Sequence, residues 1–587
     1  MSDEKTPSSQ YESFGDITTA EDYVRFWLQT ITLAKKHVAE WQKSAKSARD
    51  IYTLQEGSKK NKHTFNVLYA NIQTICPAVY NQLPIPDVRR RYSDGSNPVS
   101  KTVSQVVERV LSYTVDSPSF DSAIKNDVLD CNLLGRGVSR LQYEPVLGDE
   151  TIGLDGQLMP PQIIKQTMRV QHVDYRDFVH DTATSWDRVN WVAFRHKLTK
   201  DQIGAINPDI VDQIQYDCAV EGYAEDSADK DKDDKNLFKR AMVWEIWDKA
   251  RGKVLFIAES YKDSVLSESE PPIALDGFFP CPCPIYATNT GDLKPVVPYD
   301  YYKTQAEELN RISARIIGLL GILKYRGVVL NGLGDAFAQV GGLDDGEFSP
   351  VDDPNSLTGN NGGLDKAVWT APVERIIQVL RELTQQREQT RQVIYEITGI
   401  ADIMRGSSNA GETLGAQQIK AQWGAMRLQS LQRDVQRYIR DFMRMMAEVI
   451  SEHYQPDILS DMAGIPVDEQ IMMMLRDGIS RNYRIDIETD STVQADAQRE
   501  QGNMTQFASG IAQFLTAVVP LAQQGAIPPN IPIVMTKAFA RAFKLGREVE
   551  DALDALQQQA EAPQQQPMPM MQEQPMMPPP MAQGGLL

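Results

Sequence analysis

The feature that most constrains this chain is the stretch at residues 397–450, where a short polar loop leads into a long amphipathic run. In its second half, apolar side chains recur at the three- and four-residue spacing of an α-helix. They are Leu428, Leu431, Val435, Ile439, Phe442, Met446 and Val449. Because a long helix with one apolar stripe has to bury that stripe, the sequence predicts a helix that begins at Thr413 and packs against a larger body.

The same helix carries a row of basic side chains on one face. The row consists of Arg433, Arg437, Arg440 and Arg444, at intervals of four, three and four residues, and we call it the arginine row. Its acidic companions, at three- and four-residue offsets, are Asp434, Asp441 and Glu448. On a single helix this pattern favours a solvated ladder of ion pairs over a DNA contact.

The composition argues against several classes of function. A net charge of -19 is not that of a protein that grips nucleic acid over its whole surface, since such a grip comes from Lys and Arg displacing counterions. DNA as a passing cargo, held weakly, remains compatible with this charge. The chain has no P-loop motif, so ATP hydrolysis is expected from a partner, and we expect no enzyme activity. No apolar run reaches the about 20 residues that span a bilayer, so we expect no membrane partner.

The spacing of histidines and cysteines predicts no metal site and no cofactor. His172, His180 and His196 match no metal-binding motif, and Cys281 and Cys283 stand too close together for ordinary zinc geometry. We therefore expect these five residues to have structural roles.

The pattern along the chain predicts a mixed α+β fold that is predominantly helical. Thr19 caps a first helix, Thr199 caps a helix that ends near Gln215, further helices cover residues 104–115 and 299–326, and a hairpin closes around residues 249–252. The chain divides, in order, into a polar N-terminus (1–19), an α+β body (20–298), a first long helix (299–326), an insertion rich in Gly and Asp (327–370), a second long helix (371–403), a polar loop (404–412), the amphipathic helix with a following strand (413–490), further helices (491–559) and a Met/Pro/Gln tail (560–587). We expect the N-terminus and the tail to be disordered.

Several spaced segments resemble a known family. The most specific is ITGIADIMRGSSNAGETLGAQQIKAQWGAMRLQ at residues 397–429, and further segments are NVLYANIQTICPAVY, LLGRGVSRLQYEP, PYDYYKTQAEELNRISARI and YRIDIETDSTVQADAQ. Together with the order of the elements, they are similar to the portal protein (head-tail connector) of tailed bacteriophages, the short-tailed podovirus type being closest. The resemblance covers nearly the whole of residues 20–550.

The resemblance implies a ring, typically a dodecamer, at one vertex of a phage capsid. Double-stranded DNA passes through its channel during packaging and ejection. The implied partners are further copies of the chain, the terminase large subunit, the tail adaptor protein, and the capsid and scaffolding proteins. The implied location is the virion, after assembly in the cytoplasm of the bacterial host. The body would be the wing, the two long helices the stem, the insertion the clip, and residues 491–559 the crown.

The same resemblance assigns roles to particular residues. The loop at residues 404–412 would be the tunnel loop that faces DNA, through Arg405, Ser407, Ser408 and Asn409. Such small polar residues contact phosphates without reading bases. The docking surface of the clip would be formed by Asp335, Asp344, Asp345, Glu347, Asp352 and Asp353. In a ring, the arginine row and its acidic companions would form an ion-pairing face between neighbouring subunits.

Two alternatives belong to other classes of function. A metal-dependent nuclease would use Asp486, Glu488 and Asp490, which alternate along one strand and so share a face. Metal sites usually draw their ligands from different elements, and no histidine stands near these three, so an exposed or inter-subunit strand face is favoured. The other alternative is a helical structural scaffold without DNA contact.

Overall fold

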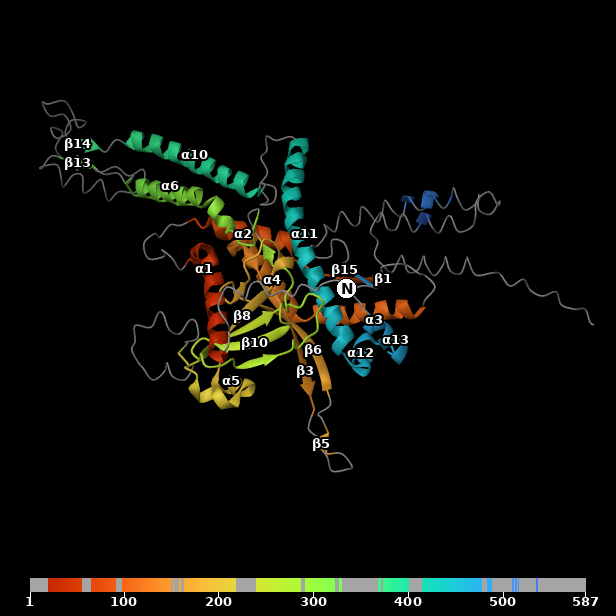
Figure 1. Cartoon of the computed structure of the whole chain (residues 1–587). Helices are drawn as coiled ribbons and strands as arrows, with labels where there is room; N and C mark the ends of the chain where they lie inside the picture. The colour runs from red at the N-terminus through yellow and green to blue at the C-terminus, as the bar shows by residue number, and fades with distance from the viewer. Residues whose placement is uncertain are drawn as a thin grey trace, which may run out of the picture. The chain divides into compact units, whose positions relative to one another are not determined.

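A computed structural model of the chain describes residues 19–54, 65–90, 98–148, 151–152, 158–159, 163–217, 239–286, 291–322, 327–329, 368–370, 373–400, 414–477, 483–487, 509–510, 512–514, 516 and 535–536. The chain divides into two compact units, Met1–Val493 and Gln494–Leu587. The elements α1 to β15 all belong to the first unit, and few residues of the second unit are described. The fold of the first unit is mixed α+β and mostly helical, as predicted (Figure 1).

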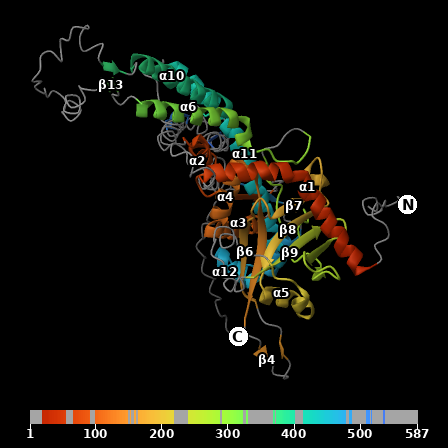
Figure 2. The same cartoon turned by 90° about the vertical axis from the view of Figure 1, so that its left-hand side faces the viewer.

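The first helix, α1 (Ala20–Tyr52), follows the prediction from its cap and its periodicity. Thr19 Oγ1 accepts a hydrogen bond from the Asp22 amide at 3.2 Å, which satisfies one of the free N–H groups of the first turn. The buried side chains recur along one stripe: Val24, Trp27, Ile31, Ala34, Val38, Trp41, Ala45 and Ala48. Figure 2 shows α1 crossing both α4 (Pro118–Leu134) and the strands of the main sheet, and this stripe joins the two regions.

The main sheet is antiparallel with the strand order β11-β10-β9-β8-β7. Its strands are β7 (Phe178–His180), β8 (Trp191–Leu198), β9 (Ala241–Asp248), β10 (Lys253–Ala258) and β11 (Ser267–Ser269). The predicted hairpin between β9 and β10 is confirmed, and Gly252 takes the positive φ of 66° that its turn requires. Trp244, Ile246, Leu255 and Ile257 pack against the N-terminal half of α1 in one hydrophobic cluster.

The largest hydrophobic cluster surrounds the long helix α11 (Leu414–His453). It contains side chains of α3 (Pro98–Val115), α4, α12 (Pro456–Ala463), α13 (Glu469–Arg476), the paired strands β1 (Pro86–Arg90) and β15 (Tyr483–Ile487), and the hairpin of β3 (Ser139–Leu147) with β6 (Ile163–His172). Helix α2 (Val67–Val79) adds Val79 to this cluster. Beyond β3 and β6, the short strands β4 (Thr151–Ile152) and β5 (Leu158–Met159) pair with each other.

The connection after α4 is a tight turn that leads from the helix into a strand. Gly135 ends α4 in the left-handed conformation with φ 93°, and its amide donates to the carbonyls of Asp130 and Cys131. Strand β2 (Arg136–Gly137) follows and pairs with β12 (Ile285–Tyr286). The turn therefore places Arg136 inside the body, where only 2% of its surface is exposed.

Two further helices form an antiparallel pair. These are α6 (Lys303–Ile322) and α10 (Val373–Thr398), which lie side by side in Figures 1 and 2. Ile312 and Ile316 pack against Leu383, and Gln386 Nε2 donates to Glu308 Oε1 at 3.4 Å. Between the two helices in the sequence, β13 (Gly327–Val329) pairs with β14 (Val368–Thr370).

Three predicted helix boundaries are wrong, and prolines explain them. The helix expected at residues 104–115 begins at Pro98, since proline is well tolerated in the first helical turn. The helix after Thr199 is α5 (Lys200–Ile206), and the chain continues from Pro208 as a 3₁₀ helix, Pro208–Gln213. The helix expected at 299–326 begins at Lys303, after the 3₁₀ turn Pro298–Tyr301. A third 3₁₀ turn covers Trp186–Arg188.

Candidate functional site

The residues assigned to function from the sequence fall into two groups. The tunnel-loop residues (Arg405, Ser407, Ser408, Asn409), the acidic residues of the clip (Asp335, Asp344, Asp345, Glu347, Asp352, Asp353), and Glu488 and Asp490 lie outside the described residues. The expected N-terminal and C-terminal disordered segments do so as well. The arginine row with its acidic companions, and Asp486, are described.

Helix α11 has two contrasting faces. Val435, Ile439, Phe442, Met446 and Val449 are buried and Leu428 and Leu431 pack against the same cluster, so the predicted apolar stripe is confirmed. The arginine row lies on the opposite side, because its residues are about half a turn away from the stripe at 100° per residue. The buried stripe therefore fixes α11 on the body, and the arginine row lies on the side of the helix that faces away from the stripe.

Arg440 joins α11 to strand β15. Its Nε lies 2.6 Å from Asp486 Oδ1, and Arg484 Nη2 lies 2.9 Å from the other oxygen of the same carboxylate. Burial favours a higher pKa for Asp486, but the hydrogen bonds from Arg484 and Arg440 outweigh it and hold the pKa below its usual value. Asp486 is thus an ion-pairing anchor. Within the described parts of the chain, no group of three His, Cys, Asp or Glu residues is arranged to hold a metal ion.

Arg437 and Arg444 make longer contacts. The guanidinium of Arg437 donates to the carbonyls of Cys283 and Pro284 at 3.5 and 3.4 Å, and lies 3.5 Å from Asp441. Arg444 reaches the other oxygen of Asp441 at 3.5 Å. Burial raises the pKa of Asp441, although the two arginines lower it. Their positive charge therefore offsets only part of the free-energy cost of burying the carboxylate.

The ends of the row face solvent. Arg433 and Asp434 are exposed, and among the described residues Arg433 has no ion pair or hydrogen bond. Arg444 is also exposed, with a single ion pair beyond 3 Å. The row is therefore divided: Arg437 and Arg440 contact other elements of the chain, whereas Arg433 and Arg444 are exposed, and the ion pair of Arg444 is with Asp441 of the same helix. Its role between subunits stays a prediction.

Glu448 lies at the edge of a cavity of about 260 Å³ between α11, the end of α13 and the segment at residues 271–278. Its Oε2 accepts a hydrogen bond from the Asp276 amide at 3.0 Å. Burial raises the pKa of Glu448 to about 7. Phe278, in the same segment, has a φ of 69°, which is strained for an aromatic residue. The hydrogen bond from Asp276 to Glu448 thus attaches the segment at residues 271–278, which contains the strained Phe278, to α11.

Replacing Glu448 with Gln is expected to remove a pH dependence of stability. The pKa of about 7 in the folded state exceeds the ordinary value of 4.5, so the folded state binds the proton more tightly. Stability falls as the pH rises from 4.5 through about 7. The Gln variant keeps the acceptor without the charge. After a discount for solvent screening, it should exceed the wild type by about 1–2 kcal/mol at pH 8 and match it near pH 4.5.

Urea unfolding at both pH values measures this difference. Glu40→Gln is a matched control, because the Glu40 side chain is 94% exposed and should leave the pH dependence unchanged. If the difference in stability between the wild type and the Glu448→Gln variant is the same at pH 4.5 and at pH 8, the prediction is contradicted.

The predicted structural roles of the histidines are confirmed by buried networks. His196 Nε2 lies 2.7 Å from Glu245 Oε2, which also accepts from Arg140. Burial opposes ionisation of Glu245, but Arg140 and His196 lower its pKa to about 2. His172 lies between Asp127 and Asp130, and His180 accepts from Tyr286. Cys281 is buried as a free thiol. Periodicity could not reveal these networks, because their partners lie far apart in the sequence.

Comparisons with known proteins add no family to this picture. A scan of the chain against protein-family models found no match, and a search of curated proteins found no similar sequence. In the described parts of the chain, no helix has the length and apolar character needed to cross a membrane.

Proposed function

We propose that this chain is the subunit of a portal-type ring, a DNA channel at one vertex of a phage capsid. Double-stranded DNA passes through the ring during packaging and ejection, and the ring is the docking platform for the terminase large subunit and then the tail adaptor. Capsid and scaffolding proteins surround it. The spaced sequence segments that resemble phage portal proteins support this proposal, and one structural observation supports the assembly of several copies.

That observation is the uncovered apolar surface of the α6/α10 pair. At the end nearer the body, Ala306 and Leu309 of α6 and Ile394 of α10 are buried in a cluster with residues of α1, α2 and α4. Farther along, the two helices bury a small core of their own, formed by Ile312, Ile316 and Leu383 with Leu319 and Leu380 at its edge. Large aliphatic side chains on both helices remain exposed: Ile317, Leu320, Ile377, Val379, Val393 and Ile397. Helices that share so small a core gain little stability from each other there, and exposed large apolar side chains are candidates for an interaction site. Neighbouring copies of the same pair would bury these side chains, as the stem of a ring requires.

The remaining elements fit the same assembly. The β13–β14 ladder between α6 and α10 is the base of the clip, whose six acidic residues would meet the motor and the tail adaptor. Arg433 and Arg444 would pair with carboxylates of the adjacent subunit, in the head-to-tail contacts that close a ring. Arg405, Ser407, Ser408 and Asn409 would contact phosphates in the channel. One arginine per subunit inside an acidic protein binds DNA weakly, which permits passage.

Negative-stain electron microscopy and light scattering of the purified full-length protein test the proposal. The wild type is expected to form rings with a central hole. The double variant Leu320→Gln with Ile377→Gln should not form rings, because two apolar side chains that would contact the neighbouring subunit are replaced by polar ones. Its circular dichroism spectrum should equal that of the wild type, since both side chains are exposed in the single chain. Leu33→Gln is the matched control: Leu33 is an equally exposed leucine on α1, 55% against 53% for Leu320, and its replacement should leave the rings intact.

Particles of a single chain, or compact particles without a hole, from the wild-type protein would overturn the proposal. Rings that persist in the double variant would show that the α6/α10 surface does not hold the subunits together. Asp486 favours no second function, since its carboxylate is engaged by Arg440 and Arg484.

A further inference from the structure

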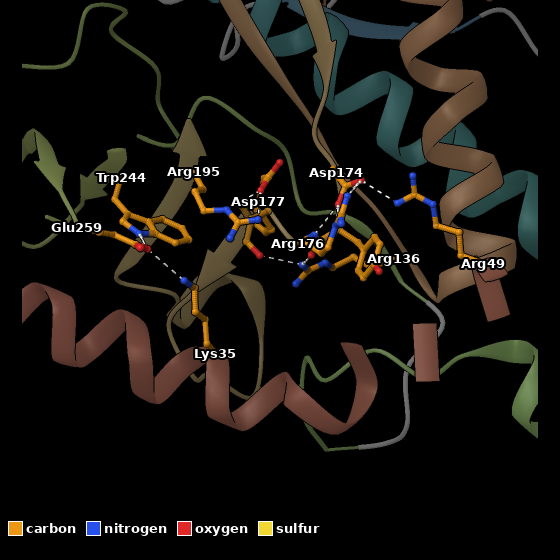
Figure 3. Close-up of polar contacts among 11 residues, drawn as sticks. Lys35, Arg49, Arg136, Asp174, Arg176, Asp177, Arg195, Trp244 and Glu259 are labelled. Carbon is orange, nitrogen blue, oxygen red and sulfur yellow. Dashed lines mark hydrogen bonds and ion pairs between the residues drawn. The ribbon is translucent and has the colours of Figure 1, made fainter. Parts of the chain in front are cut away.

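Several half-buried carboxylates of this body lie beside a cation. Between α1 and the strands of the body, Arg176 Nε lies 2.8 Å from Asp174 Oδ1, and Arg195 Nε lies 2.7 Å from Asp177 Oδ1 (Figure 3). Burial favours a higher pKa for Asp174, but the hydrogen bonds from Arg176 outweigh it and hold the pKa below its usual value. Glu448, at the edge of the cavity of about 260 Å³, is also half-buried but is held differently.

Charged groups of three elements face Glu448, and within the described part of the chain none of them forms an ion pair with it. They are Arg444 and Glu452 of α11, Asp276 of the segment at residues 271–278, and Arg476 at the end of α13. Arg444 pairs with Asp441 instead. The Glu448 carboxylate accepts a hydrogen bond from the Asp276 amide at 3.0 Å, and its burial raises its pKa to about 7. Its charge is therefore poorly compensated once it ionises.

The backbone that donates to Glu448 belongs to a tight turn at residues 274–278, which we call the Glu448 turn. The Phe278 amide donates to the Leu275 carbonyl at 3.0 Å and closes this turn. Asp276 and Gly277, at its tip, are exposed, and a Cβ added to Gly277 would meet no described atom within 4 Å. The outer side of the turn therefore has room to move.

Buried side chains fix the chain on both sides of the Glu448 turn. Ile273 before it and Phe279 after it are 3% and 4% exposed and belong to the largest hydrophobic cluster. Within the turn, Phe278 holds its strained positive φ of 69°. Opening of the turn alone relieves this strain without displacing Ile273 or Phe279. Segments with few buried contacts open at a low cost in free energy.

Opening of the turn is coupled to a proton, because it brings the Glu448 carboxylate into water. In the closed state the pKa of Glu448 is raised to about 7, and in the open state it falls toward the ordinary value of 4.5. The closed state therefore binds the proton more tightly. Its advantage is fully present below pH 4.5 and is lost as the pH rises through about 7.

We propose that the Glu448 turn is a pH-sensitive switch, closed on α11 while Glu448 is protonated and opening more often once Glu448 is ionised. Opening widens the adjoining cavity and uncovers the side chains of Leu275 and Phe278, which are half-buried in the closed turn. The closed form stays the major one at pH 8, so the body of the protein remains folded. The switch does not depend on ring formation, since the turn, α11 and α13 belong to one chain.

Hydrogen–deuterium exchange of the full-length protein, followed by mass spectrometry between pH 5 and pH 8, tests the switch. Each rate is divided by the intrinsic rate of an unprotected amide at the same pH. Protection of the peptide that covers residues 274–278 is expected to fall about tenfold from pH 5 to pH 8, after a discount for solvent screening. At both pH values it should lie at least about tenfold below the protection of the β9–β10 hairpin, because the turn opens without unfolding of the body.

Two variants identify the titrating group. Glu448→Gln keeps the acceptor without the charge, so protection of the turn should be the same at pH 5 and pH 8. Glu452→Gln is the matched control, because Glu452 lies one turn farther along α11 and lines the same cavity, whereas the hydrogen bond of the turn goes to Glu448. Its protection should fall with pH as in the wild type. Circular dichroism checks that both variants are folded.

The wild-type comparison needs no variant and can overturn the proposal by itself. Protection of residues 274–278 that is equal at pH 5 and pH 8 overturns it. Protection of the turn equal to that of the β9–β10 hairpin does so too, because the turn then opens only when the body unfolds. A fall of the same size in Glu448→Gln assigns the pH dependence to another group and also overturns the proposal.

Discussion

Gly137→Ala is expected to prevent the body of the protein from folding. A Cβ at this position would lie 2.1 Å from the carbonyl oxygen of Asp127, and 2.7 and 2.8 Å from two further backbone atoms of the same residue. Helix α4 and strand β2 are therefore packed backbone against backbone, and no side chain can move aside to make room. The loss should exceed about 4–5 kcal/mol, a large part of the total stability of a domain.

Soluble expression, circular dichroism and urea unfolding measure this effect. Gly318→Ala in α6 is the matched control, since nothing lies within 4 Å of its Cβ, and alanine in a helix should stabilise it by about 0.5–1 kcal/mol. A Gly137→Ala protein that unfolds at the urea concentration of the wild type would show that the close contact of α4 with β2 is absent in solution.

Asp127→Ala is expected to cost about 3–5 kcal/mol, the usual effect of removing one partner from a buried charged pair. The Asp127 carboxylate is fully buried, with one oxygen 2.7 Å from His172 Nδ1 and the other accepting from the Tyr438 hydroxyl at 2.8 Å. That hydroxyl accepts in turn from the Ser139 amide at 2.7 Å. The substitution therefore removes the hydrogen bonds that link α4 to β6 and to α11, and through Tyr438 to β3.

The same cluster predicts a loss of stability at alkaline pH. Burial opposes the charge on His172, but Asp127 and Asp130 outweigh it and raise its pKa to about 10, above the ordinary 6.5. The charged imidazolium stabilises the fold fully below pH 6.5, and this contribution is lost as the pH rises through about 10. Urea unfolding between pH 6 and 10 should show the decline in the wild type and a flatter curve in Asp127→Ala.

A surface ion pair provides the control for Asp127. Asp212 pairs with Lys200 at 2.7 Å, but both side chains are more than half exposed, so Asp212→Ala should change stability by less than about 0.5 kcal/mol. Equal losses for Asp127→Ala and Asp212→Ala would contradict the assigned role of the buried cluster.

Local chemistry in the sequence predicts much of the framework. Thr19 and Thr199 cap their helices, the β9–β10 hairpin closes at Gly252, and the apolar stripe of α11 is buried as its spacing indicates. Caps, turns and periodicity act over a few residues, so they can be recognised without knowing what packs against them. The misplaced helix ends at Pro98 and Pro208 were also local, and proline is the signal that could have corrected them.

The contacts of the candidate site could not be predicted from the sequence, because the ion-pair and hydrogen-bond partners lie far apart along the chain. The arginine row is visible in the sequence, but only the tertiary structure divides it, by placing Asp486 against Arg440 across 46 residues and leaving Arg433 and Arg444 outward. Likewise, Tyr438 meets Asp127 across 311 residues, and Arg136 is buried with two backbone carbonyls, those of Tyr175 and Phe178, as hydrogen-bond acceptors. The sequence alone determined which helices and turns form, because their causes are short-range. Which charges are paired, buried or left for another molecule was decided by the fold, because electrostatic partners and desolvation depend on neighbours that packing brings together.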